Sequence, residues 1–265
     1  MSVREDCRSE PGAPWRRYLK GSGTLEFTSS TWRLVMVDTS AQQYTDIQLD
    51  DYEGLPRHEF LWRPPLAMTV RARFSHPADQ LQGTAGFGFW NDPFLMTGWR
   101  RPTLPRAVWF FFASPPSQMI LDLDVPGQGW KAATIDAGRW PFLLLLPTAP
   151  LAVPLTNIRS LRRLLWPIAQ RSMKVREALV DVDVTAWHIY EIAWLKDRSQ
   201  FRVDGQVVLD GAPSPRGPLG FVLWMDNQYA VVTPWGRLGY GLLAASGPQW
   251  LEVGEIAIEA VESAD

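Results

Sequence analysis

The sequence predicts an all-β protein in which two antiparallel sheets pack as a sandwich, with one helical insertion. Several segments alternate apolar and polar residues with a period of two, as half-buried strands do. The last third of the chain, residues 187–260, has the pattern of a strand, a hairpin, another strand and a closing strand. Residues 155–180 instead show the apolar spacing of a helix. A chain of 265 residues fits one domain of this kind.

The N-terminal part contains the first strands. Residues 1–22 combine prolines and glycines with many charges, so we expect a poorly ordered lead-in before a single domain of residues 23–265. Alternation at 25–27 and 32–37 predicts the first two strands. Residues 42–56 are polar and acidic and are expected to form a loop over one sheet.

The central part predicts the middle of the sheets. Residues 66–74 alternate cleanly, which indicates a strand with one wet face. Residues 84–90 contain glycines that indicate a bulge or a close approach of backbones. Residues 107–113 are nearly all apolar and predict a central strand buried on both faces. Residues 118–124 and 131–135 are expected to follow as a hairpin pair.

The predicted helical insertion, residues 155–180, is amphipathic. Leucines and an isoleucine form one stripe, and arginines lie on the opposite side. One interpretation is a helix that covers a sheet edge or the mouth of a cleft. The alternative is a lid, or a helix that binds a protein partner through its basic face.

Composition excludes several function classes. The net charge of −2 gives no sign of binding to nucleic acid or to an anionic membrane. The single cysteine, Cys7, allows no disulfide framework and makes a cysteine-based metal site implausible. The N-terminus lacks the apolar core of a signal peptide, and the longest aliphatic run, 143–146, is too short to span a bilayer. We therefore expect a cytoplasmic protein.

Tryptophan is the compositional outlier, with 14 residues. Each indole offers a large apolar face and one N–H donor. Such an excess is typical of sandwiches that bind sugars, where rings stack on pyranose faces. The alternative is that most of these rings simply fill the core between the sheets.

Two clusters combine an indole with polar groups at a strand end: residues 90–92 and residues 224–227. Asn-Asp-Pro after a strand is also ordinary turn chemistry. Our main hypothesis for the site is that the two clusters converge on one pocket. The candidate ligand-binding residues are Trp90, Asn91, Asp92, Trp109, Phe111, Trp224, Asp226, Asn227, Tyr229 and Trp235.

The C-terminal third resembles a known family. Trp187-His188-x-Tyr190-x-Ile192-x-Trp194, then Phe201-x-Val203-Asp204-Gly205 and the strand 219–227, are similar to the C-terminal half of concanavalin A-like lectin/glucanase domains. The nearest resemblance is to family-16 glycoside hydrolases such as laminarinases. It implies a jelly roll of two curved antiparallel sheets whose concave face forms a cleft.

The resemblance also implies a strand carrying Glu-x-Asp-x-x-Glu or Glu-x-Asp-x-Glu, because retaining hydrolysis needs two carboxylates about 5–5.5 Å apart. The strand in the corresponding place, 107–113, contains no carboxylate. Hydrolysis of the family type is therefore not expected, and whether the protein is an enzyme stays open. The catalytic candidates are Asp92, Asp122, Asp124, Asp226 and His188. No histidine has metal-ligand spacing, so no cofactor is expected; a structural calcium, common in this fold class, has no motif here.

Three functions remain open from the sequence. The first is a degenerate glucanase-like sandwich that binds a carbohydrate or another small ligand in an aromatic cleft. The second is an enzyme of different chemistry acting on an apolar molecule, such as a lipid, terpenoid or polyketide, in the same cleft. The third is a module that binds a protein partner through the basic helix.

Overall fold

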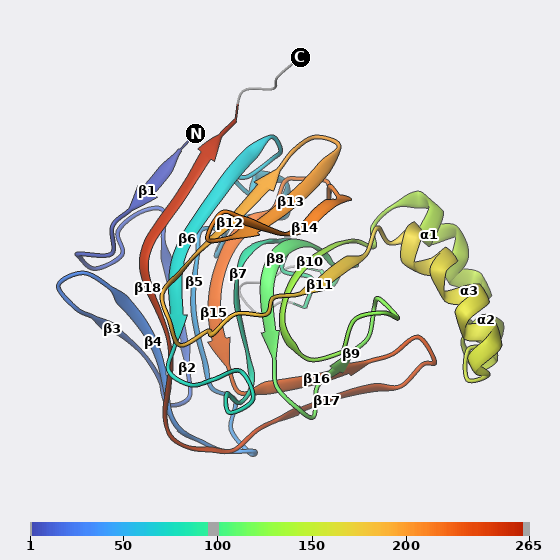
Figure 1. The fold of residues 1–265 in the computed structure, drawn as a ribbon, viewed down its shortest axis with the longest axis horizontal. Coiled ribbons are helices and arrows are strands. Elements are labelled where there is room, and N and C mark those ends of the chain that lie inside the picture. The colour runs from blue at the N-terminus through green and yellow to red at the C-terminus, as the bar shows by residue number, and fades with distance from the viewer. Residues whose placement is uncertain (1, 95–100, 262–265) are drawn as a thin grey trace.

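Two antiparallel β-sheets pack face to face in the computed structural model, which describes residues 2–94 and 101–261 (Figure 1). The eight-stranded sheet contains, in spatial order, β14 (Gln206–Pro213), β13 (Arg198–Val203), β12 (His188–Trp194), β6 (Leu66–Phe74), β18 (Ala245–Ala260), β4 (Trp32–Thr39) and β3 (Gly23–Phe27), with β1 (Val3–Glu5) paired to β18. The seven-stranded sheet contains β11 (Arg176–Leu179), β10 (Gly129–Asp136), β8 (Arg106–Ala113), β7 (Thr84–Trp90), β15 (Gly220–Asp226), β5 (Asp46–Asp50) and β2 (Arg16–Lys20). The two-sheet sandwich predicted from the sequence is confirmed.

The main core lies between the two sheets and follows from the period-two patterns. Along β6 every second residue is buried, including Met68 and Val70, while Thr69 and Arg71 are only partly covered. From the other sheet, β8 contributes side chains such as Phe110 to the same core. Burial of alternate apolar side chains from both sheets is the principal source of stability in such a sandwich.

Several predicted strands are confirmed. The segments 66–74 and 84–90 are β6 and β7 with the same ends, and 107–113 lies within β8. The turn between β13 and β14 is formed by Asp204 and Gly205, both with positive φ, as a two-residue hairpin turn requires.

The prediction of a loop over residues 42–56 is wrong at its centre, because Asp46–Asp50 forms the buried strand β5. Ile47 and Leu49 face the core, whereas Asp46, Gln48 and Asp50 alternate onto the other face of the sheet. The polar residues that suggested a loop are therefore one face of a strand.

Two other boundaries also differ from the predictions. The expected poorly ordered lead-in contributes β1 and β2 to the two sheets. The expected hairpin of 118–124 with 131–135 does not form, because β9 (Gln118–Met119) is only two residues long and pairs in parallel with β16 (Gln228–Val232). A small third sheet is completed by β17 (Leu238–Leu242).

The helical insertion starts and ends earlier than predicted. It comprises α1 (Trp140–Leu145), the 3-10 turn η2 (Leu146–Thr148), α2 (Ala149–Leu155) and α3 (Arg159–Ser172), and β11 follows; a further 3-10 turn, η1 (Arg57–Glu59), lies elsewhere. The helices project from one end of the sandwich (Figure 1). The C-terminal part of the predicted helix is a strand because residues 176–179 pair with β10. Among the described residues, no helix is long and apolar enough to cross a membrane.

Candidate functional site

The candidate site lies on the face of the seven-stranded sheet that points away from the eight-stranded sheet, which we call the open face. A second apolar cluster forms there, separate from the main core. Its centre is a group of four rings from three adjacent strands, which we call the aromatic floor: Trp90, Trp109, Phe111 and Trp224.

The rings of the aromatic floor contact one another directly. Trp90 and Trp224 are nearly parallel, with an interplanar angle of 5° and ring centroids 6.5 Å apart. Trp109 lies 5.8 Å from Trp90, 5.4 Å from Phe111 and 5.3 Å from Trp224. Offset and tilted arrangements at these distances are favourable for aromatic pairs. The floor is therefore a packed surface rather than a set of separate rings.

Two glycines in β7 make room for the floor. A Cβ atom at Gly86 would lie 2.7 Å from the ring of Trp224 and would also meet the Phe110 carbonyl oxygen. A Cβ atom at Gly88 would lie 2.6 Å from the Cα atom of Trp109, and Gly88 has a φ of +146°. The glycines predicted to mark a close approach of backbones thus let the indoles lie across the strand.

Two of the indole N–H groups are used inside the protein, and one is not. Trp90 donates to the Tyr52 hydroxyl at 2.6 Å, and Trp224 donates to the Thr84 hydroxyl at 3.1 Å. Trp109 is partly exposed, and its N–H has no hydrogen-bond partner among residues 2–94 and 101–261. Trp109 therefore offers a ring face and a donor to a ligand.

A pair of buried carboxyl groups lies next to the floor. Asp46 on β5 and Asp226 on β15 are directly opposite in the antiparallel register, and both are almost fully buried. Thr84 connects the pair to the floor, because its hydroxyl accepts from Trp224 and donates to Asp226 at 2.9 Å. The backbone N–H of Gln228 also donates to Asp226, at 2.9 Å.

The two acids cannot both be charged easily in this environment. Burial raises the pKa of Asp226 to about 7. Burial, and then the neighbouring Asp226 carboxyl, raise the pKa of Asp46 well above its ordinary value. The Tyr44 hydroxyl lowers the pKa of Asp46, but less than burial and Asp226 raise it, and neither Asp46 oxygen accepts a hydrogen bond from the described residues. Burial therefore favours the protonated form of both carboxyl groups.

On the other side of the floor lies a buried ion pair. Lys131 on β10 is adjacent to Phe111 in the register, and its Nζ atom is 3.2 Å from Oε1 of Glu177 on β11. The Lys131 ammonium also donates to two backbone carbonyls. Burial raises the pKa of Glu177, and the second carboxylate oxygen, Oε2, has no partner among the described residues. This oxygen is enclosed by the protein, on the second strand beyond the floor.

The structure brings together only part of the predicted site. Trp90, Trp109, Phe111, Trp224 and Asp226 share the open face. The polar ends of the two predicted clusters have structural roles instead, at Asn91, Asp92 and Asn227.

Asn91 joins the end of β7 to the start of β8, because it donates to the Leu104 carbonyl and accepts from the backbone N–H of Arg106. Asp92 is fully buried at a positive φ, and its carbonyl accepts from Arg57. The Asn227 side chain makes four hydrogen bonds to backbone groups and is buried. These residues fix loops.

The remaining candidates lie apart from the floor. Asp122 accepts from the backbone N–H of Asp124 at 3.2 Å in a turn, so the two acids do not form a pair on one strand face. His188 belongs to the eight-stranded sheet, where its ring contacts Asp204 at 2.6 Å and the Asp183 carbonyl at 2.8 Å.

The rings of the two candidates in the β16–β17 region also contact other parts of the protein. The ring of Tyr229 lies against Gly241 of the paired strand. Trp235 lies in the turn between these strands, under the Arg162 guanidinium at 4.1 Å. The described residues contain no group of three or more His, Cys, Asp or Glu that could hold a metal ion.

Sequence reasoning missed Asp46, together with Thr84 and Tyr52. The available signal was the spacing of Asp46, Gln48 and Asp50, which places polar side chains on one face of a strand. Their proximity to Asp226 depends on the pairing of β5 with β15, which no local pattern reveals.

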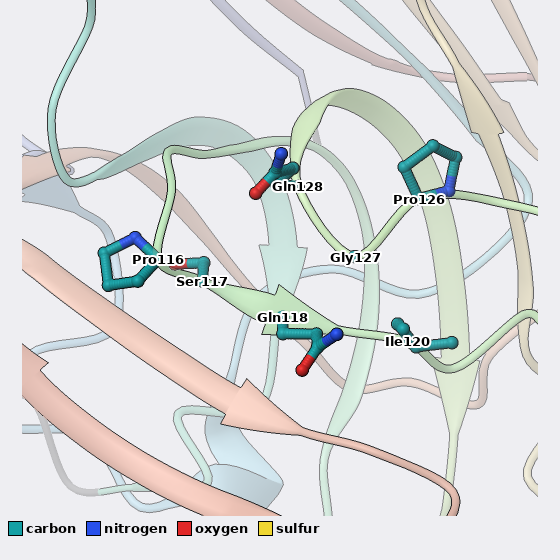
Figure 2. A pocket seen from close by; sticks show the side chains of 7 residues that line it. All are labelled: Pro116, Ser117, Gln118, Ile120, Pro126, Gly127 and Gln128. Carbon is teal, nitrogen blue, oxygen red and sulfur yellow. The ribbon is translucent and has the colours of Figure 1, made fainter.

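A polar hollow borders the open face. It has a volume of about 390 Å³ and lies between residues 116–120 and 126–128, with the side chains of Ser117, Gln118 and Gln128 around it (Figure 2). Leu121, next to Ile120 of this hollow, packs against the apolar cluster of the open face. The hollow therefore lies beside a segment that packs on this cluster, and Gln118 and Gln128 bring amide groups to it.

Comparison with solved structures finds similar architectures over nearly the whole chain. A Crh5 transglycosylase in complex with NAG matches with a TM-score of 0.52 and 13% identity, covering 98% of this chain and 84% of the other. A prokaryotic β-1,3-1,4-glucanase from a mouse hindgut metagenome matches with a TM-score of 0.53 and 10% identity, covering 98% and 99%. A laminarinase from Flavobacterium sp. UMI-01 matches with a TM-score of 0.50 and 12% identity, covering 97% and 98%.

The chain has the concanavalin A-like jelly-roll fold. No known family model and no curated protein sequence matches it. The fold expected from the resemblance is thus confirmed by structure at an identity too low to carry over an activity. Within this jelly roll, β8 presents Ala107, Trp109 and Phe111 to the open face, and none of the three is a carboxylate.

Proposed function

We propose that the protein binds a carbohydrate on the open face of its jelly roll, with the ring of Trp109 as the stacking surface. The observation that carries this proposal is the partial exposure of Trp109 and Phe111 within the aromatic floor, where neighbouring rings hold them in place. A ring that its neighbours already hold in place loses little conformational entropy when a sugar stacks on it.

Polar groups around the floor suit a hydroxylated ligand. The N–H of Trp109, which has no hydrogen-bond partner among the described residues, can donate to a sugar hydroxyl. The amides of Gln118 and Gln128 extend this supply on the neighbouring loops. Apolar faces combined with a few placed polar groups are the usual composition of small-ligand sites.

The arrangement of the acids favours binding over hydrolysis. Asp226 and Glu177 are separated by four strand positions, which corresponds to roughly 19 Å, far beyond the separation of hydrolytic carboxylate pairs. Asp46 and Asp226 are adjacent, but their carboxyl groups are enclosed. A sugar bound on the floor could not reach them without a rearrangement of Thr84 and Gln228.

The test is isothermal titration calorimetry with β-1,3 and mixed-linkage gluco-oligosaccharides and with N-acetylglucosamine oligomers. We expect Trp109→Ala to weaken binding at least about tenfold, or ~1.4 kcal/mol, because the stacking ring is lost. Trp187→Ala is the matched control, since Trp187 is also partly exposed but lies on the other sheet under Arg71.

Equal losses for the two variants, or no binding of any oligosaccharide, would contradict the proposal. Release of reducing ends from a bound oligosaccharide, abolished by Asp226→Asn, would show that the acid pair is catalytic and that the protein is more than a binding module.

A second candidate is binding or conversion of an apolar small molecule on the same face. It is favoured by one observation: Phe142 of α1 and Trp166 and Ala169 of α3 pack against the same apolar cluster, so helices border the floor. Saturable binding of a fatty acid or terpenoid that depends on Trp109, with no binding of oligosaccharides, would support this candidate instead.

A further inference from the structure

The helical insertion differs from the rest of the chain in charge. Residues 137–176 contain seven of the 26 basic residues and none of the 28 acidic residues. The remainder of the chain is correspondingly acidic, with 19 basic against 28 acidic residues. The overall net charge of −2 therefore conceals a strongly basic element.

The first half of the insertion has no charge at all. Residues 140–158 form a run of 19 uncharged residues that includes a tryptophan, a phenylalanine and six leucines. Many of its apolar side chains are exposed, and further exposed apolar side chains follow in α3. The exposed apolar residues are Trp140, Leu143, Leu144, Leu146, Leu151, Leu155, Ile158, Leu164 and Ile168. Such a concentration of exposed apolar side chains marks an interaction surface.

The insertion is firmly attached to the sandwich, so this surface is held in place. Trp166 of α3 donates to the Leu121 carbonyl at 2.9 Å. The Thr156 hydroxyl donates to the Pro234 carbonyl at 2.6 Å, and Val153 packs against Gly236 in the same turn. Phe142 enters the apolar cluster of the open face.

Basic side chains border the apolar surface. Arg159 and Arg163, one helical turn apart, are exposed and line an open hollow of about 540 Å³ together with Ile158. On α3, Leu164 and Ile168 are also one turn apart and exposed, and Arg171 follows within the next turn.

We propose that the helical insertion docks the protein on an anionic phospholipid membrane, lying in the plane of the interface. Charge complementarity selects this partner, since residues 137–176, which contain the insertion, have seven basic groups and no acid. Apolar helices rich in leucine and tryptophan and bordered by arginine bind in this way without crossing the bilayer. The exposed apolar side chains are distributed over α1, η2, α2 and α3, as an extended lipid surface requires.

The test is flotation of the full chain with phosphatidylcholine vesicles that contain or lack phosphatidylserine. We expect binding to vesicles containing phosphatidylserine, weaker binding to those without it, and a decrease with rising salt. The double variant Leu144→Glu with Leu151→Glu should bind at least about tenfold more weakly, because it puts charge into the apolar surface. The double variant Arg159→Glu with Arg163→Glu should bind anionic vesicles about tenfold more weakly, with no such loss on vesicles that lack phosphatidylserine.

The matched control is Ile189→Glu with Val207→Glu, at two exposed apolar positions of the eight-stranded sheet that are 45% and 50% exposed. It should bind vesicles like the original chain. Circular dichroism and thermal unfolding must show that every variant folds, which is expected because Leu144 and Leu151 are 67% and 74% exposed.

No vesicle binding, or an equal loss in the control, overturns the proposal. A dimer that the Leu144 and Leu151 changes dissociate would overturn it too, because a second copy would then cover the surface.

Discussion

The outer face of the eight-stranded sheet and the open face of the seven-stranded sheet both carry tryptophans beside a buried carboxylate, but their partners differ. On the outer face, Trp187 lies under Arg71 and Arg73, at 4.0 and 4.8 Å. Trp250 lies under Arg33 and Arg73, at 4.6 and 5.3 Å. The ring faces there are occupied by guanidinium groups of the protein itself.

The carboxylates of the two faces also differ in the partners that the protein supplies to them. Glu252 on the outer face accepts from Thr31, Arg33 and Arg73, and these partners lower its pKa. On the open face, Asp46 and Asp226 have no positively charged partner among the described residues, and burial raises the pKa of both. The comparison teaches that abundance of tryptophan does not locate a site. The face that retains free ring surface and free polar atoms is the better candidate.

The largest difference in stability between the two faces is expected when one tryptophan ring is removed from each. Trp224 is 8% exposed and packs on Trp109, Phe111 and Gly86, so Trp224→Ala should destabilise the protein by about 3–5 kcal/mol. Trp250→Ala should cost about 1 kcal/mol, because that ring is partly exposed and loses chiefly its arginine contacts. Urea unfolding measures both, and equal losses would mean that the floor is not a packed unit.

A change of pH is expected to have a smaller effect on stability. The sign of this effect is opposite on the two faces. The folded pKa of Asp226, about 7, lies above its ordinary value of 3.8. Its contribution to stability is therefore complete below the ordinary value and is lost as pH rises through about 7. Asp226→Asn keeps an acceptor for Thr84 but needs no proton, so it should stabilise the protein at alkaline pH by ~1–3 kcal/mol and have little effect in acid.

Glu252 should behave in the opposite way. Its folded pKa lies below the ordinary value of 4.5, so its contribution is present above that value and is lost as pH falls. Glu252→Gln should therefore destabilise the protein at neutral and alkaline pH, by about 1 kcal/mol, and converge with the original chain in acid. Denaturant unfolding across the pH range checks both variants. Parallel pH profiles would show that the two faces do not differ in electrostatics.

Local patterns predicted the strands but not all of their neighbours. The ends of β6 and β7 follow from alternation and from flanking turn residues, which act within a few residues. The pairing of β9 with β16, and of β5 with β15, joins segments more than 100 residues apart. Such pairings depend on the whole sheet order, which a local pattern cannot reveal.

The composition of the open face was predictable to a similar extent. Trp90, Trp109, Phe111 and Trp224 could be identified because strand periodicity places them on known faces. Asn91 and Asn227 were misjudged because an amide at a strand end suits a ligand and a loop equally well, and here backbone groups use them. The basic face of the helical insertion was predicted from the arginine spacing, although the total charge of −2 gives no sign of it.

The central claim is that a sugar occupies the open face at Trp109. Hydroxyl-radical footprinting of the tryptophans, read by mass spectrometry with and without a gluco-oligosaccharide, tests it most directly. Trp109 is predicted to become protected by the ligand, whereas Trp187 and Trp250, already covered in part by arginines, should be unchanged. Protection of Trp187 or Trp250 while Trp109 stays equally reactive would contradict the account.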